Sequence, residues 1–131
     1  MERILPRPTE FSAPYWAGCR EGRLLLQYCR SCESHQFYPR SLCSHCHGDA
    51  LEWRDSSGQG RVASFTVVHR GVSEAYPAPY VVALIDLEEG PRMMSHVIDV
   101  EPGGLSVGDR VAVEFQAWSD DVDVPVFRVV D

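Results

Sequence analysis

Two Cys-x-x-Cys pairs constrain the fold of this chain more than any other feature of its sequence. The pairs are Cys29 with Cys32 and Cys43 with Cys46, about ten residues apart. This spacing is typical of tight turns that each aim two thiolates at one point, so two turns can form a four-sulfur cage. Such a cage is a closed zinc site with no open position for water or substrate. The pattern therefore predicts a structural metal site, with zinc preferred over iron, in a ribbon that the metal stabilises.

Other uses of the cysteines stay open on the sequence alone. Two disulfides would require an oxidising compartment, but residues 1–8 do not resemble a signal peptide, so we expect a cytoplasmic protein. Redox chemistry normally uses one Cys-x-x-Cys motif and not two matched ones. His35, His45 and His47 lie near enough to suggest a mixed-ligand site, although four cysteines already complete the shell. Cys19 is interpreted as a small buried side chain, with a nucleophile as the alternative.

Charge is distributed unevenly along the chain. Residues 1–47 carry six arginines against four acidic residues, a net charge of +2, whereas residues 48–131 carry six against fifteen, a net charge of −9. Surfaces that bind nucleic acid concentrate positive charge, so the acidic part argues against a nucleic-acid partner. No apolar run approaches the roughly 18 residues of a membrane span, and we expect no membrane partner.

The hydrophobic pattern predicts a mainly β chain with a short N-terminal helical segment. The helix is expected to begin after Ser12, with Thr9 or Ser12 as its cap, and to end near Gly22. Apolar runs over 24–28 and 51–54 are expected to form strands on either side of the cysteine pairs.

Beyond residue 58 the pattern is β throughout. Five apolar or alternating runs are separated by turn residues: 61–70, 80–87, 92–100, 110–118 and 125–130. Short strands without an amphipathic helix between them predict a small closed barrel of the OB type. We therefore expect an arm and helix over 1–22, a zinc ribbon over 23–57 and a five-stranded OB-fold barrel over 58–131. The serines and glycines of 56–60 suggest a flexible joint between ribbon and barrel.

No set of nucleophile, base and orienting group is evident in the sequence. His69 and His96 lie in strand patterns, where a packing role is the usual one. Asp86, Glu88 and Glu89 cluster at a turn and are interpreted as solvated side chains. Chemistry by this chain alone is therefore not expected.

Several motifs together resemble a known family. They occur in the order Pro14-Tyr15-Trp16, Glu21-Gly22-Arg23-Leu24, the four cysteines, Leu51-Glu52-Trp53, Gly58-x-Gly60, Thr66-Val67-Val68-His69, Pro79-Tyr80-Val81-Val82-Ala83-Leu84 and Gly90-Pro91-Arg92. Over about residues 10–118 the chain resembles the acyl-CoA-associated family that pairs a rubredoxin-like zinc ribbon with an OB-fold barrel, formerly domain of unknown function 35.

The resemblance implies a non-catalytic accessory subunit in a hetero-oligomer. Its partner would be a thiolase-like enzyme, such as an aldolase, or a hydratase, acting on acyl-CoA in steroid or fatty-acyl degradation. The accessory subunit would bind or position the CoA moiety, and the four cysteines carry over as zinc ligands. Because the first part of the chain is electropositive and CoA carries phosphates, the expected CoA contacts are Arg20, Arg23, Arg40, His69 and Arg70.

Two further functions stay open at this point. Zinc ribbons and OB barrels both occur in nucleic-acid-binding modules, although the acidic barrel argues against this use. A free-standing acyl-CoA enzyme would have to use Cys19 or His69 as its reactive group.

Overall fold

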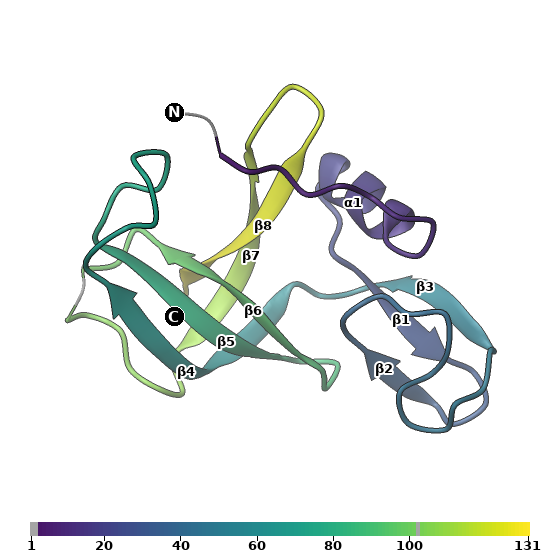
Figure 1. Cartoon of the computed structure of the whole chain (residues 1–131). Coiled ribbons are helices and arrows are strands. Elements are labelled where there is room, and N and C mark those ends of the chain that lie inside the picture. The colour runs from purple at the N-terminus through teal and green to yellow at the C-terminus, as the bar shows by residue number, and fades with distance from the viewer. Residues whose placement is uncertain (1–2, 102) are drawn as a thin grey trace.

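Figure 1 shows a helix and a small sheet beside a larger barrel. This computed structural model describes residues 3–101 and 103–131; the first two residues of the predicted arm lie outside them. The elements in chain order are α1 (Ala13–Arg20), β1 (Leu25–Cys29), β2 (Ser34–Gln36), β3 (Leu51–Asp55), β4 (Gln59–Val68), β5 (Tyr80–Leu87), β6 (Arg92–Ile98), β7 (Arg110–Ala117) and β8 (Asp123–Val129). The predicted mainly β class is confirmed. Within the described residues, no helix is long and apolar enough to cross a membrane.

Helix α1 begins where two hydroxyl side chains close a turn. The Thr9 hydroxyl accepts the N–H of Ser12 at 3.1 Å, and the Ser12 hydroxyl accepts the N–H of Thr9 at 2.8 Å. Thr9 therefore caps this turn, whereas the Ser12 side chain makes no capping bond to the helix. Pro14 lies in the first helical turn, where its missing N–H is tolerated. A Cβ at Gly18 would lie 2.8 Å from Leu25 Cδ1, so glycine permits the close packing of α1 on β1.

The ribbon is a three-stranded antiparallel sheet with the order β2-β1-β3. Strands β1 and β3 confirm the two predicted runs to within a residue at each end. Strand β2 was not predicted, because it has only three residues and no apolar pattern. It pairs with β1 from Gln27 opposite Gln36 to Cys29 opposite Ser34, which places it beside the first cysteine pair.

The barrel closes in the strand order β4-β5-β6-β8-β7, as predicted for an OB fold. Every neighbouring pair is antiparallel except β6 and β8, which run parallel and pair only at Val97 with Phe127 and Ile98 with Arg128. Strand β6 ends two residues earlier than predicted, because Asp99 takes a left-handed conformation with φ of 54°. The closing seam is therefore the shortest pairing in the barrel.

One buried core extends from the helix and ribbon into the barrel. Alternate residues of β5 are buried, as expected for a strand whose one face forms the barrel interior. Phe127 and Ile85 are fully buried there and belong to the same packed cluster as Tyr15 of α1 and Leu26 of β1. The division into three segments stays a prediction, because this core crosses their boundaries.

Acidic side chains of the β5–β6 turn hold the joint between ribbon and barrel. Glu89 accepts the Ser56 hydroxyl at 2.7 Å and the Ser57 N–H at 2.8 Å, and Glu88 accepts the Ser57 hydroxyl at 2.8 Å. Asp86 pairs with Arg92 at 2.6 Å. Glu88 is exposed, and Asp86 and Glu89 are partly exposed, in keeping with the predicted solvated acids. The hydrogen bonds of Glu88 and Glu89 nevertheless constrain the joint that was expected to be flexible.

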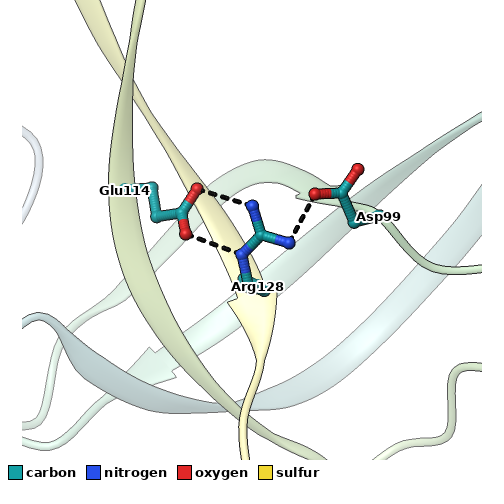
Figure 2. A network of polar contacts seen from close by, with 3 residues as sticks. All are labelled: Asp99, Glu114 and Arg128. Carbon is teal, nitrogen blue, oxygen red and sulfur yellow. Dashed lines mark hydrogen bonds and ion pairs between the residues drawn. The ribbon is translucent and has the colours of Figure 1, made fainter.

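An arginine on β8 bridges the barrel where it closes. Figure 2 shows Arg128 between Glu114 of β7 and Asp99, which follows β6. Its Nε and one terminal nitrogen donate to the two Glu114 carboxylate oxygens at 2.6 and 3.0 Å, and its other terminal nitrogen donates to Asp99. This two-pronged contact lowers the pKa of Glu114 below its ordinary value. Arg128 thereby links three segments beside the short parallel seam.

Replacing Arg128 by methionine is expected to lower barrel stability at pH 7 and to lower it by less near pH 3. The folded-state pKa of Glu114 is lowered, so the pair stabilises the fold above the unfolded-state pKa. That contribution is lost as the pH falls through the lower, folded-state value. Urea-unfolding midpoints of both proteins at the two pH values measure the effect. An equal difference at both pH values would contradict it.

Candidate metal centre and neighbouring groove

The four predicted ligands, Cys29, Cys32, Cys43 and Cys46, form one cluster. Their sulfur atoms all lie within 4.8 Å of one another, with 3.6 Å between Cys29 and Cys46 and 3.5 Å between Cys32 and Cys43. Sulfurs bound about 2.3 Å from a tetrahedral zinc lie about 3.8 Å apart. The cluster therefore has the donor set and the dimensions of a four-cysteine zinc site.

The two cysteine turns share one backbone geometry. In the first, Glu33 has φ of 58° and donates its N–H to the Cys29 carbonyl at 2.8 Å. In the second, His47 has φ of 63° and donates to the Cys43 carbonyl at 3.0 Å. Hydrogen bonds from the backbone N–H groups of each turn lower the pKa of its first cysteine, to about 6 for Cys43. Each turn thus favours the thiolate form of its first cysteine, the form that binds metal. The pKa of the second cysteine of each turn, Cys32 or Cys46, is instead raised, partly by hydrogen bonds with the neighbouring thiols.

The neighbouring histidines have other surroundings. Among the described residues, the metal-ligand cluster consists of the four cysteines and includes no histidine. The His35 ring lies 4.9 Å from the Tyr28 ring in an edge-on contact across β1 and β2. His45 and His47 lie in the second cysteine turn, and both are exposed. The structure therefore favours the four-cysteine site over the mixed-ligand alternative.

Two buried glutamines order the segment that leads into the second cysteine turn. Gln36 donates to the Gln27 carbonyl oxygen at 2.7 Å and accepts the Ser44 N–H at 2.7 Å. Gln27 in turn donates to the Arg40 carbonyl and accepts the Arg40 N–H, both at 2.8 Å. This network could not be predicted from the sequence, because a glutamine in a strand carries no sign of the loop that it will contact. It fixes the backbone on both sides of Leu42, next to the ligand Cys43.

Replacing Gln36 by leucine is expected to destabilise the protein by about 1–3 kcal/mol, because the part-buried Ser44 N–H and the buried Gln27 side chain lose their partner. It should also accelerate zinc loss to a chelator. Urea unfolding and the rate of metal transfer to a coloured chelator measure the two effects. Gln116→Leu is the matched control, since Gln116 is half-buried and has no side-chain hydrogen bond within the described residues. A Gln36 variant that behaves like this control would show that the network does not support the metal centre.

The five predicted CoA contacts lie in separate parts of the structure. Arg20 donates to the Asp120 carbonyl at 2.6 Å, and Arg23 pairs with Asp55 and Glu21. Arg40, His69 and Arg70 are exposed and form no ion pair within the described ranges 3–101 and 103–131. Arg40 lies on the ribbon, whereas His69 and Arg70 begin the loop after β4, on the side of the barrel away from the ribbon (Figure 1). The structure does not bring the five together into one phosphate site.

Cys19, the alternative nucleophile, is fully buried in α1. Burial raises the pKa of its thiol to about 12, despite a hydrogen bond with Tyr15 that acts in the opposite direction. The thiol is therefore neutral at pH 7 and shielded from substrate, as expected for a packing residue. The interpretation of Cys19 as a small buried side chain is supported.

An apolar groove lies where helix, ribbon and barrel meet. It has a volume of about 600 Å³. Its walls come from α1 and the turn before it, residues 37–39 of the ribbon, the middle of β6, and residues 124–126 of β8. Among the described residues, no arginine or acidic side chain lines it. This groove could not be predicted from the sequence, because its walls come from segments distant in the chain.

The sequence matches two protein families in succession. Residues 16–52 match "ChsH2, rubredoxin-like zinc ribbon domain", and residues 53–116 match "ChsH2, C-terminal OB-fold domain". The chain is 37% identical over 90 residues to a DUF35 domain-containing scaffold protein of Methanothermobacter thermautotrophicus, covering 67% of this chain and 68% of that protein.

Two other comparisons cover nearly the whole chain. A probable enoyl-CoA hydratase alpha subunit of Thermomonospora curvata is 30% identical over 127 residues, which are 95% of this chain and 40% of that protein. The chain thus spans about two fifths of that relative's length. The solved structure "Ltp2-ChsH2(DUF35) aldolase" superposes with a TM-score of 0.88 and 28% identity, covering 95% of this chain and 98% of the matched chain.

Proposed function

Because the chain belongs to the DUF35 family of ChsH2-type zinc-ribbon and OB-fold proteins, we propose that it is an accessory subunit of an acyl-CoA enzyme. Its partner is a thiolase-like aldolase or an enoyl-CoA hydratase subunit. The observation that carries the proposal is the similarity to the chain in the Ltp2–ChsH2 aldolase, which covers almost all of both chains. The hydratase name of the Thermomonospora relative supports the second kind of partner.

A non-catalytic role fits the chemistry of the described side chains. The four-cysteine cluster leaves no coordination position for substrate when zinc is bound, so the metal stabilises the ribbon. The buried Cys19 thiol is neutral at pH 7 and His69 lies on an exposed loop. In this proposal the partner supplies the groups that make or break bonds, and the accessory chain supplies structure and substrate contacts.

The accessory chain also binds or positions the CoA moiety in this proposal. Of the predicted contacts, Arg40 and Arg70 have no ion pair within the described residues and can neutralise phosphate directly. His69 lies beside Arg70 and can donate a hydrogen bond. Arg20 and Arg23 would first have to exchange their present partners. Steroid and fatty acyl groups are both proposed as the acyl part of the substrate. The proposed compartment is the cytoplasm, where the zinc-binding thiols stay reduced.

Capture of the tagged, zinc-loaded chain from its host tests the partner directly. We expect a thiolase-like or hydratase-like subunit in a fixed molar ratio, stable to washing at moderate salt. Recovery of the chain alone, or with nucleic acid that is released by salt, would contradict the proposal. Arg40→Ala and Arg70→Ala are then expected to weaken acyl-CoA retention by the captured complex without dissociating it. Unchanged retention in both variants would exclude these CoA contacts.

A further inference from the structure

The groove between helix, ribbon and barrel has the size and composition of a small-molecule site. Its volume of about 600 Å³ lies within the range of roughly 300–1,000 Å³ that is usual for ligand pockets. Tyr15 and Trp16 of α1, Met94 of β6 and Val126 of β8 contribute to its lining. Met94 is 57% exposed, although its side chain is apolar. Covering such a concave apolar surface with an apolar group lowers the free energy, because both surfaces leave water.

The chemistry of the groove lining suits the hydrocarbon part of an acyl thioester and not its charged CoA part. Within the part of the chain that the structure describes, no arginine or acidic residue lines the groove, although 24% of the chain is charged. Burial and the nearby Arg3 lower the pKa of His96, so this lining side chain is neutral at pH 7. The groove therefore cannot neutralise CoA phosphates but suits an uncharged hydrocarbon group.

One buried donor of the lining lacks a partner. Trp118 contributes to the groove wall, and its indole N–H is buried without an acceptor within the described residues. This nitrogen has almost no accessible surface, so an occupant of the groove does not reach it. Trp118 therefore contributes the apolar surface of its ring to the groove wall.

The metal-bearing ribbon forms one wall of the groove. Phe37 packs its ring 5.4 Å from Tyr15 and 4.3 Å from Tyr38, and residues 37–39 line the groove. The next residue is Arg40, which is exposed. Its backbone N–H and carbonyl both form hydrogen bonds with the Gln27 side chain. The ribbon thus places a cation with no ion pair among the described residues directly after the groove wall.

We infer that the groove binds the acyl group of a CoA thioester, while Arg40 contacts a CoA phosphate outside it. This inference rests on the proposed function and specifies which part of the substrate this chain holds. The acyl group leaves water and covers the apolar walls, and the CoA phosphates stay at the solvated surface of the ribbon. The class of ligand is a medium or long apolar acyl thioester.

Octanoyl-CoA, free CoA and octanoate, titrated into the zinc-loaded full chain by calorimetry, test the inference. Octanoyl-CoA is expected to bind at least tenfold more tightly than free CoA. Met94→Asp should remove this preference by placing a charge in the groove at an exposed position. Tyr38→Ala, a second change at the groove wall, should weaken octanoyl-CoA binding as well. Arg40→Ala should weaken binding of octanoyl-CoA and leave binding of octanoate unchanged.

Val107→Asp is the matched control, since Val107 is 65% exposed and lies outside the groove lining. It should bind octanoyl-CoA like the unmodified chain. Equal affinities for octanoyl-CoA and CoA, or unchanged octanoyl-CoA binding by Met94→Asp, would overturn the inference. Partner capture by the same variants separates the two proposals. If octanoyl-CoA does not bind and Met94→Asp abolishes capture, the groove is a protein-docking surface and the accessory role stands.

Discussion

Replacing Cys43 by serine is expected to release the metal and to unfold the ribbon. Zinc binding contributes about 10–16 kcal/mol of apparent free energy in zinc-finger peptides, which is comparable to the whole stability of a small domain. Cys43 is buried, and the other thiol of its turn, Cys46, is already one of the four ligands, so it cannot replace Cys43. Metal content by mass spectrometry and protease sensitivity of the ribbon measure the loss.

The effect should extend beyond the ribbon. Leu24 and Leu26 belong to the same buried cluster as the barrel residue Phe127, so unfolding of the ribbon exposes part of the barrel core. Cys19→Ala is the control, because this thiol lies outside the metal cluster and the variant should keep its zinc. A Cys43→Ser protein that melts like the unmodified one, with or without zinc, would show that the metal does not stabilise this fold.

Replacing Phe127 by alanine is expected to lower the free energy of unfolding by about 3–5 kcal/mol, through lost burial and the cavity that remains. Phe127 is fully buried and sits opposite Val97 in the short parallel seam that closes the barrel. Urea unfolding at neutral pH measures the change. Phe11→Ala removes the same side chain from a position that is 45% exposed, and should cost less than about 1 kcal/mol. Similar losses in the two variants would contradict the assignment of the core.

The features that could be predicted from sequence are those with a local chemical signature. Cysteine spacing identified the metal cluster, and apolar alternation with intervening turn residues identified the barrel strands. Pro14 and the hydroxyls before it predicted the helix start correctly: Ser12 is the N-cap residue, and the Thr9 hydroxyl accepts its N–H. In each case the signal lies within a few neighbouring residues, and the tertiary structure agrees with it.

Features that depend on contacts between distant segments could not be predicted. The roles of Gln27 and Gln36 follow from a strand register and a loop, and neither is visible in composition. The hydrogen bonds of Glu89 could not be seen in the sequence, because its partners Ser56 and Ser57 are more than thirty residues away in the chain. The groove likewise needs helix, ribbon and barrel to be assembled. The predicted CoA contacts were chosen by charge alone, and the structure separates them.

Reconstituted activity tests the accessory role most directly. The captured partner enzyme, the zinc-loaded chain and a mixture of both would each be assayed for cleavage or hydration of an acyl-CoA substrate. We predict that the chain alone shows no turnover and that the mixture is faster than the partner alone by at least tenfold. Turnover by the chain alone, abolished by Cys19→Ala or His69→Ala, would contradict the accessory role, and so would a partner that is equally active without the chain.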